Sequence, residues 1–286
     1  MRKPNFLIIG AMKSGTTTLH RYLEQHPSIY MSPIKEPHYF SCRDIDSAPI
    51  KTWHDYTKLF DAVSEEIAIG ESSTTYLTSK DAANRIKECI PDVKLIVIFR
   101  NPVEAAYSLY LMKYRAQLSG KSECQIIEGF DKIARPGEKS GIINGRFYYG
   151  QIKYYYDLFG GEQLKFLLYE DLKEDPSSLL REVFEFLGVD EMAINVSKRH
   201  NTGGVPKNRF FYNLVNDLKQ NQGLRGILPK SLQPAIYNLY LRVRKYNLAA
   251  SPKLPPDIHA TLVERYKDDI LKLQDLISRD LSGWLS

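Results

Sequence analysis

Near its start the sequence reads Phe6-Leu7-Ile8-Ile9-Gly10-Ala11-Met12-Lys13-Ser14-Gly15-Thr16-Thr17-Thr18, and this stretch decides the fold. The apolar run 6–10 predicts a short buried strand, and the apolar spacing in 16–25 predicts a helix after it. The turn between them holds glycines, a lysine and hydroxyl side chains. Glycines let backbone N–H groups face a ligand, and a helix N-terminus attracts negative charge. The stretch therefore predicts a strand, a turn that cradles an oxyanion, and a helix.

The order of strand followed by helix returns three times along the chain. The pairs are residues 66–70 with 79–89, residues 94–99 with a helix that begins near Pro102, and residues 164–169 with a helix over 176–187 that Gly188 ends. Strands that alternate with helices form a parallel sheet with helices on both faces. The predicted fold class is α/β, a P-loop-like parallel sheet flanked by helices, with a helical C-terminal segment.

The chain of 286 residues has 43% hydrophobic and 26% charged residues, which is ordinary for a globular protein and excludes disorder, collagen and coiled coil. We predict a single domain over 1–286. Residues 119–146 carry glycine and proline with few periodic apolar residues, which predicts a partly helical insertion of the kind that forms lids. Residues 199–286 are predicted to be mostly helical, with two apolar stripes. These are Leu232, Ile236, Leu239, Val243 and Tyr246, then Leu262, Tyr266, Ile270, Leu273 and Ile277.

The apolar runs and the cysteines of the sequence indicate where the protein is located and whether it binds a metal. It contains no run of 18 apolar residues and no cleavage signal after Met1, so we expect a cytoplasmic protein without a transmembrane segment. Its three cysteines, Cys42, Cys89 and Cys124, are widely spaced and lack a nearby histidine pair. This pattern favours neither a disulfide framework nor a zinc site.

Positive charge gathers in one part of the chain. Residues 191–256 hold eleven Lys and Arg against two acids, a local charge of +9, while the whole chain carries +5. Such an excess favours an anionic partner: a phosphorylated cofactor, an acidic glycan, a lipid surface or nucleic acid. A solvated basic face is the alternative.

The position of Lys13 relative to the glycines distinguishes this chain from the P-loop nucleoside triphosphatases. Their motif places the lysine directly after the second glycine, as GxxxxGK[ST], whereas Lys13 precedes Gly15. No apolar run ends in an acidic pair that would offer a magnesium ligand. An oxyanion other than a magnesium-bound triphosphate is therefore favoured.

Two motifs resemble the sulfotransferases that use 3′-phosphoadenosine 5′-phosphosulfate (PAPS). In that family a KxGTT loop grips the 5′-phosphosulfate, and the matching residues here are Lys13, Ser14, Gly15, Thr16 and Thr17. A strand that ends in arginine, with a serine eight residues on, grips the 3′-phosphate, and Arg100 and Ser108 match it. Residues 148–159, 168–172, 175–176, 186–188 and 280–284 also resemble the family, so the likeness covers nearly the whole chain.

Residues 33–40 most resemble the branch that includes heparan sulfate sulfotransferases and bacterial enzymes acting on glycans, lipids or carrier-bound metabolites. The resemblance implies that Glu36 is the general base and that His38 is a second polar residue of the active site. An alcohol is a poor nucleophile, so a carboxylate that takes its proton suits this chemistry. An ordinary surface carboxylate is the alternative reading of Glu36.

Some positions depart from the glycan-modifying relatives. Ser72 and Ser41 stand where several of them carry a lysine and an aspartate. A smaller or different hydroxyl acceptor therefore gains weight over a heparin-like polymer. Glu71 is expected either to orient Lys35, Lys13 or the acceptor, or simply to end a strand. In the loop 199–209, Lys207 and Arg209 are candidate ligands of the 3′-phosphate, with a solvated loop as the alternative.

The resemblance implies transfer of a sulfuryl group from PAPS to a hydroxyl, less readily an amine, of a glycan, lipid or carrier-bound metabolite. Lys13 would also be catalytic, by neutralising charge on the bridging oxygen of the leaving nucleotide. The expected acceptor is hydroxyl-bearing and can itself be anionic. No metal and no nucleic acid are expected, whereas contact with a membrane surface and the oligomeric state stay open. The alternatives are a P-loop-type kinase and a catalytically inactive nucleotide-binding relative.

Overall fold

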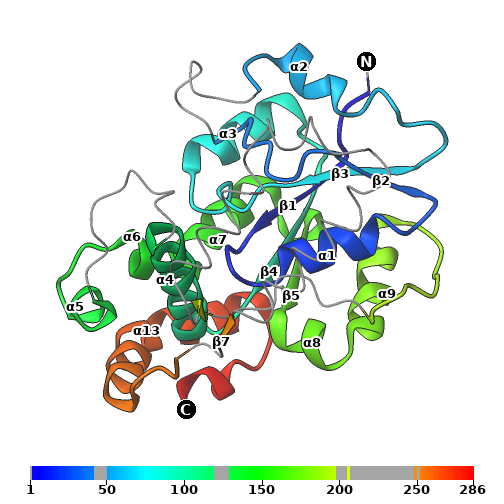
Figure 1. The fold of residues 1–286 in the computed structure, drawn as a ribbon. Helices are drawn as coiled ribbons and strands as arrows, with labels where there is room; N and C mark the ends of the chain where they lie inside the picture. Colours follow the sequence, from blue (N-terminus) through cyan, green and yellow to red (C-terminus); the bar gives the residue numbers. More distant parts are fainter. Residues whose placement is uncertain (1, 42–49, 119–128, 198–204, 207–247, 250–251) are drawn as a thin grey trace, which may run out of the picture.

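Five parallel strands form one sheet in the described part of the chain, in the order β2-β3-β1-β4-β5 (Figure 1). They are β1 (Phe6–Gly10), β2 (Ile29–Met31), β3 (Ala68–Ser72), β4 (Lys94–Phe99) and β5 (Leu164–Leu168). The computed structural model describes residues 2–41, 50–118, 129–197, 205–206, 248–249 and 252–286. Because β1 lies in the middle of the sheet, the loop after it opens at the centre of the sheet's carboxyl edge, where α/β proteins bind ligands.

Helices follow the strands as the pattern of the sequence predicts. They are α1 (Thr16–Leu23), α2 (Trp53–Lys58), α3 (Lys80–Cys89), α4 (Pro102–Leu118), α5 (Phe130–Ala134), α6 (Gly141–Asn144), α7 (Tyr148–Phe159), α8 (Tyr169–Glu174), α9 (Pro176–Leu187) and α13 (Pro256–Ile277). Two 3₁₀ helices, η1 (Gly161–Gln163) and η2 (Ser282–Leu285), and a two-residue antiparallel pair, β6 (Val205–Pro206) with β7 (Leu248–Ala249), complete the described elements.

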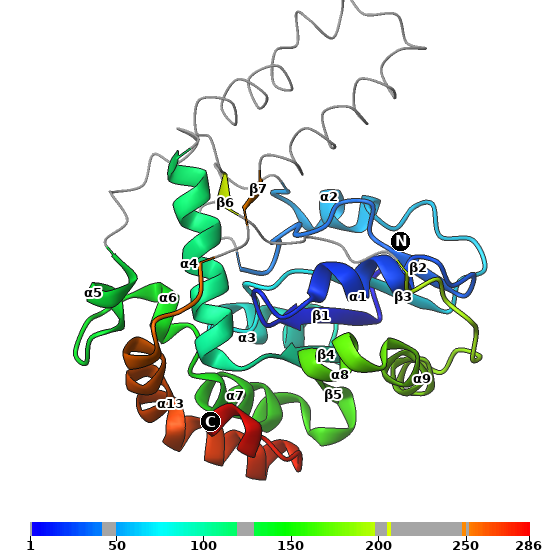
Figure 2. The same ribbon diagram turned by 60° about the horizontal axis from the view of Figure 1, so that its bottom comes forward.

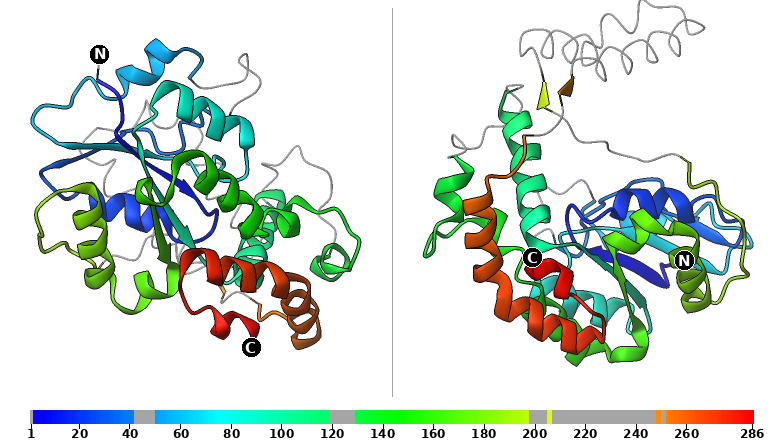
Figure 3. Two further views of the ribbon diagram at one scale, coloured as in Figure 1. Left: turned by 180° about the vertical axis from the view of Figure 1, so that it is seen from behind. Right: turned by 90° about the horizontal axis from the view of Figure 1, so that it is seen from below.

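Both faces of the sheet are covered, which explains why every residue of β1 is buried. Leu7 and Ile9 belong to the core shared with α3, α4, α7 and α13. Phe6 and Ile8 belong to the core shared with α1 and α9 on the opposite face (Figure 3). The predicted class is confirmed: a parallel sheet flanked by helices.

Close packing of β1 against β3 needs a glycine in β3. Phe6 pairs with Gly70, and a Cβ at position 70 would lie 2.3 Å from the Phe6 ring. The aromatic ring therefore occupies the space that any larger residue would need.

Helix boundaries agree with capping signals in the sequence. Ser79 accepts a hydrogen bond from the Ala82 N–H at the start of α3, and Pro102 is the first residue of α4. Gly188 ends α9 in the left-handed conformation, with φ 77°. The sequence predicts this strand over 66–70, whereas β3 spans Ala68–Ser72 and the preceding Ile67 is exposed.

The predicted insertion and C-terminal segment are described only in part. Residues 129–146 contain the short helices α5 and α6, whereas 119–128 lie outside the described residues. The first predicted apolar stripe and most of the basic segment 191–256 also lie outside them. All five residues of the second stripe are buried on α13, as expected from their helical spacing: Leu262, Tyr266, Ile270, Leu273 and Ile277.

The C-terminal helix α13 lies along α7 and fixes its start (Figure 3). Asp269 of α13 accepts the Tyr148 N–H at 2.7 Å and the Tyr149 N–H at 3.2 Å. These are two of the first N–H groups of α7, which have no acceptor inside their own helix. Within the described ranges, no helix has both the length and the hydrophobicity needed to cross a bilayer.

Candidate active site

The loop between β1 and α1 forms an anion cradle at the centre of the sheet edge. Lys13 and Gly15 adopt positive φ angles of 72° and 90°. Gly15 is the N-cap of α1, so no cap side chain covers the N–H groups of the first turn. A Cβ at position 15 would lie 2.8 Å from Leu172 and 2.9 Å from Tyr169, so a larger residue would displace the loop. The backbone of this loop is thus held tightly with the open end of a helix beside it.

Lys13 lies among cations. Burial lowers the pKa of its ammonium group, and the nearby charges of Arg115, Arg100 and Arg146 lower it further, in that order. Its Nζ is 3.6 Å from Met112 Sδ, and Figure 2 shows α4 passing beside the loop after β1. A partly buried cation whose strongest charged neighbours are all cations favours an anionic ligand, because that ligand would relieve the repulsion.

Arg100 follows β4 and contacts the same loop. Its Nη1 donates to the Lys13 carbonyl at 3.2 Å, and its guanidinium lies over the Tyr169 ring at 4.6 Å. Its Nη2 pairs with Glu104 Oε2 at 2.8 Å. Ser108 lies four residues after Glu104 and four before Met112, so it shares the helix face that reaches Lys13.

A third arginine is enclosed beneath this region. Arg146 is 3% exposed; Nη1 donates to the Gly145 carbonyl, while Nε and Nη2 have no hydrogen-bond partner in the described part of the chain. The Ser14 Oγ and Tyr148 Oη are likewise buried and unpartnered there. Burial raises the pKa of Tyr148 to about 12, while Arg146 and Ser14 act to lower it. The sequence predicts neither Arg146 nor Arg115 as a site residue, because a lone arginine carries no motif.

Glu36 lies in a second cluster, beside the end of β3. Its carboxylate accepts from Lys35 Nζ at 2.8 Å, from the Thr74 N–H at 3.0 Å and from Thr74 Oγ1 at 3.2 Å. Its backbone N–H donates to the Ser72 carbonyl at 2.9 Å, and its φ is 61°. The side chain remains 28% exposed, so it is both oriented and accessible.

His38 stands next to that carboxylate. Its Nε2 is 3.6 Å from Glu36 Oε2, and its Nδ1 is 2.9 Å from Thr75 Oγ1. The Ser41 hydroxyl is 2.7 Å from the same Thr75 oxygen. Ser41 therefore joins the polar chain of His38, although it departs from the aspartate of some relatives.

The two clusters come together because β1 and β3 are neighbouring parallel strands whose carboxyl ends share one edge. His20 links them: its Nδ1 is 2.9 Å from Ser72 Oγ, and burial together with the Lys35 charge lowers its pKa to about 4. Lys207 and Arg209 lie outside the described residues. Glu71 is expected from the sequence either to orient Lys35, Lys13 or the acceptor, or to end a strand. It stands one residue before the end of β3, and its carboxyl group accepts a hydrogen bond from Tyr56 Oη at 3.2 Å. Among the described residues it makes no hydrogen bond to a lysine.

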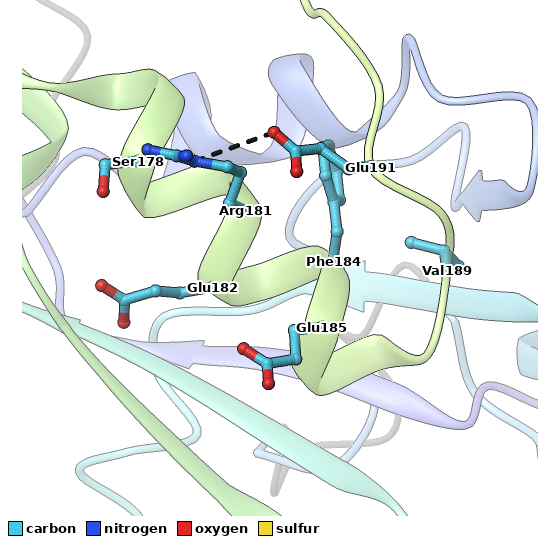
Figure 4. A pocket seen from close by; sticks show the side chains of 7 residues that line it. All are labelled: Ser178, Arg181, Glu182, Phe184, Glu185, Val189 and Glu191. Atoms are coloured by element: carbon cyan, nitrogen blue, oxygen red, sulfur yellow. Dashed lines mark ion pairs between the residues drawn. The ribbon is translucent and has the colours of Figure 1, made fainter.

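Among the described residues no group of three His, Cys, Asp or Glu could hold a metal ion, and Cys42 and Cys124 lie outside them. A pocket of about 460 Å³ on α9 shares no residue with either cluster (Figure 4). It is lined by Ser178, Arg181, Glu182, Phe184, Glu185, Val189 and Glu191.

The family model of the sulfotransferase domain matches residues 3–207. The chain belongs to the sulfotransferase domain family. A mouse heparan sulfate glucosamine 3-O-sulfotransferase 3A1 is 30% identical over 193 residues, 65% of this chain and 46% of that protein. A human bifunctional heparan sulfate N-deacetylase/N-sulfotransferase 3 is 29% identical over 203 residues, 66% of this chain and 22% of that protein. The chain thus matches less than half the length of these relatives.

Solved structures agree with the fold. A sulfotransferase from Alicyclobacillus acidocaldarius has a TM-score of 0.71 and 28% identity, and the match covers 100% of both chains. Mouse sulfotransferase SULT7A1, solved in complex with PAP, has a TM-score of 0.52 and 15% identity over 97% of this chain and 87% of its own. The second likeness concerns the fold alone.

Proposed function

We propose that this protein is a sulfotransferase that moves a sulfuryl group from PAPS to a hydroxyl of an acceptor. One observation carries the proposal: a helix N-terminus with Lys13 and Arg100 lies at the end of β1, and the accessible carboxylate of Glu36 lies at the end of the neighbouring strand β3. The first group suits an anionic donor, and the second suits removal of a proton.

The residues around the loop fit the anionic parts of PAPS. The amides of 14–17 and Lys13 would hold the 5′-phosphosulfate, while Arg100 and Ser108 would hold the 3′-phosphate. Support comes from the charge around Lys13 and from the buried guanidinium of Arg146, which has unpartnered nitrogens among the described residues. Lys207 and Arg209 remain predicted contributors to the 3′-phosphate subsite.

The carboxylate of Glu36 would accept the proton of the acceptor hydroxyl. PAPS, when bound, supplies a sulfuryl group whose transfer leaves the phosphate oxygen with negative charge. The ammonium of Lys13 would stabilise that charge, and preorganised donors of this kind are the largest common source of catalysis. The reaction as proposed needs no metal, because a sulfuryl group carries less negative charge than a phosphoryl group.

The proposed acceptor is a hydroxyl of a glycan, a lipid or a carrier-bound metabolite. Ser72, in place of the lysine of several glycan-modifying relatives, lies 2.9 Å from His20 Nδ1 through its hydroxyl and supplies no positive charge for an acidic acceptor. This favours a smaller acceptor over a heparin-like polymer. A cytoplasmic location remains a prediction, and one Dictyostelium discoideum relative, 35% identical over 107 residues, is named as membrane-associated.

Binding and transfer are tested separately. PAP, the product of the donor, should raise the unfolding free energy by about 2.7 kcal/mol at a concentration of 100 times its Kd. 5′-AMP at the same concentration should stabilise less, because it lacks the 3′-phosphate. Arg100→Ala should weaken PAP binding far more than 5′-AMP binding. Equal stabilisation by the two nucleotides would contradict the 3′-phosphate subsite.

Transfer is tested by incubating the protein with PAPS and a panel of hydroxyl-bearing acceptors, with mass spectrometry to detect the gain of one SO₃ group. Turnover should persist with EDTA present. A kinase would instead require ATP with magnesium and would add a phosphoryl group, which distinguishes that alternative. Binding of PAP without transfer to any acceptor would favour the inactive nucleotide-binding alternative.

A further inference from the structure

Glu71 is a fully buried carboxyl group directly beneath the cluster that holds Glu36. It stands in β3 and is 0% exposed. Tyr56 Oη donates to its Oε1 at 3.2 Å, while Oε2 has no hydrogen bond of normal geometry in the described structure. The hydroxyls of Ser73 and Tyr76 lie near enough to favour its ionised form. A buried carboxyl with so few partners is costly, and the proposed chemistry does not use it directly.

The two hydroxyls beside Glu71 hold the loop that carries Glu36. The His38 N–H donates to Ser73 Oγ at 3.1 Å, and the Phe40 N–H donates to Tyr76 Oη at 3.4 Å. Together with the bond from the Glu36 N–H to the Ser72 carbonyl, these bonds attach every second amide of 36–40 to the last residue of β3 or to the segment after it.

This loop needs to be held. Glu36 and His38 both have positive φ angles, 61° and 56°, which residues with a Cβ rarely adopt. Such backbone conformations persist only where the surroundings impose them. The bonds from the loop amides to Ser73 and Tyr76 are part of what imposes them here.

A hydroxyl group has one hydrogen to donate and lone pairs to accept with. When the hydrogens of Ser73 and Tyr76 point to a carboxylate, their lone pairs are left for the loop amides. A protonated Glu71 would instead donate a hydrogen of its own and compete for those lone pairs.

We propose that Glu71 is a positioning residue for Glu36: its carboxylate orients the hydroxyls of Ser73 and Tyr76, and these hold the loop in the geometry that proton removal requires. The inference rests on the proposed function for the role of Glu36. The proposed relay, which runs from Glu71 through the hydroxyls of Ser73 and Tyr76 to the amides of the loop, does not depend on that role.

The ionisation of Glu71 supports a pH-dependent contribution. Burial raises its pKa to about 7; the hydroxyls of Tyr76, Ser73 and Tyr56 lower it, and the charge of Glu36 raises it. The groups that face it or its neighbours are Tyr56 from α2, Ser73 and Tyr76 after β3, Glu36 with Lys35 and His38 from the loop, and His20 beside Ser72 from α1. The relay should therefore strengthen as pH rises through neutrality.

The first test compares Glu71→Gln with Glu65→Gln, the same change at an exposed carboxylate just before β3. Hydrogen exchange at the amides of His38 and Phe40 should be about tenfold faster in Glu71→Gln, the loss of roughly one hydrogen bond, and unchanged in the control. In PAPS turnover, kcat should fall about tenfold while the Kd for PAP changes less than about twofold.

The second test uses Tyr56→Phe, which removes one donor to Glu71 and keeps the ring that stacks on Tyr39 at 4.7 Å. Among the described residues, the Tyr56 hydroxyl donates to Glu71 and makes no hydrogen bond to the loop itself. The inflection near neutral pH in the kcat profile should move to higher pH in this variant, and should disappear in Glu71→Gln.

Unchanged exchange at His38 and Phe40 in Glu71→Gln would overturn the inference, as would an unshifted kcat profile in Tyr56→Phe. Where Glu71→Gln does not fold, Tyr56→Phe and Glu71→Asp carry the same exchange measurement. Absence of transfer by the unmodified protein would contradict the proposed function, whereas the exchange result would still decide the positioning role.

Discussion

Arg100 and Glu104, four residues apart, form an ion pair. Oε2 of the glutamate lies 2.8 Å from Nη2 of the arginine and 3.1 Å from its Nε. Arg100 is also the residue proposed to hold the 3′-phosphate. The carboxylate therefore occupies the guanidinium edge that a phosphate would use. A ligand phosphate has to displace it or share the guanidinium with it.

Glu104→Gln should tighten PAP binding. Glu104 is 55% exposed, so the pair is worth about 0.2–1 kcal/mol after solvent screening, which corresponds to an increase in affinity of roughly 1.5- to 5-fold. Calorimetric titration measures it. Asp157→Asn on α7, which removes the ion pair with Lys153, is the matched control and should leave the Kd unchanged. Weaker binding in Glu104→Gln would mean that the glutamate orients Arg100 instead of competing for it.

Glu36→Gln should lower turnover roughly 10²-fold or more, because the variant keeps the shape of the side chain and loses the proton acceptor. The Kd for PAP should stay within about twofold, since the hydrogen bonds of the Glu36 carboxylate are to Lys35 and Thr74 and not to the loop of Lys13. Single-turnover kinetics separates the two effects. Near-normal turnover would transfer the role of base to His38.

The unfolding free energy should depend on pH through Glu71. Its pKa is raised to about 7 in the folded protein, above the usual 4.5, so the folded state binds the proton more tightly than the unfolded chain. The free energy of unfolding is therefore highest below about pH 4.5, where Glu71 is protonated in both states. It falls by on the order of 3 kcal/mol as pH rises through about 7 and the buried carboxyl group ionises. Urea unfolding at several pH values should show this loss in the unmodified protein. The same decline in Glu71→Gln would assign it to other groups.

Arg146→Met should weaken PAP binding about tenfold by removing positive potential near Lys13. It should not lower the stability of the ligand-free protein, because a buried guanidinium with unpartnered nitrogens costs desolvation energy that methionine does not. Thermal unfolding with and without PAP measures both effects. Reduced stability combined with unchanged PAP affinity would show that Arg146 supports only the packing around α7.

The elements that the sequence predicts well are those whose signals are local. β4 is apolar from Leu95 to Phe99 because both faces of the sheet are buried, and Ser79 and Gly188 mark helix ends by their own chemistry. The strand β2 spans only three residues, too short for a periodic pattern. The start of β3 was misplaced because pairing with β2, and not the apolar character of Ile67, determines where it begins.

In the candidate site, too, the residues that belong to local motifs are predictable and those that only the fold brings together are not. Lys13 and Arg100 are predictable because their motifs lie beside strands that are themselves predictable. The surroundings of Glu71 are not, because Tyr56 and Tyr76 reach it from segments that only the sheet brings together. Arg115 and Arg146 are missed for a related reason, since a single arginine in a sequence is usually solvated and only the fold shows these two beside Lys13.

The contacts that α13 makes with the rest of the domain have a consequence for the order of biosynthesis. Asp269 caps α7, and Arg265 donates to the carbonyls of Ala134, Arg135 and Glu138 in the segment around α5. A growing chain releases the strands, the loop of Lys13 and the loop of Glu36 long before it releases α13. Until residue 269 has left the ribosome, the start of α7, which adjoins Arg146, lacks its cap. A nascent chain therefore completes the proposed anion site only after α13 has been made, and fragments that stop before α13 should be poor ligand binders even though every motif residue is present.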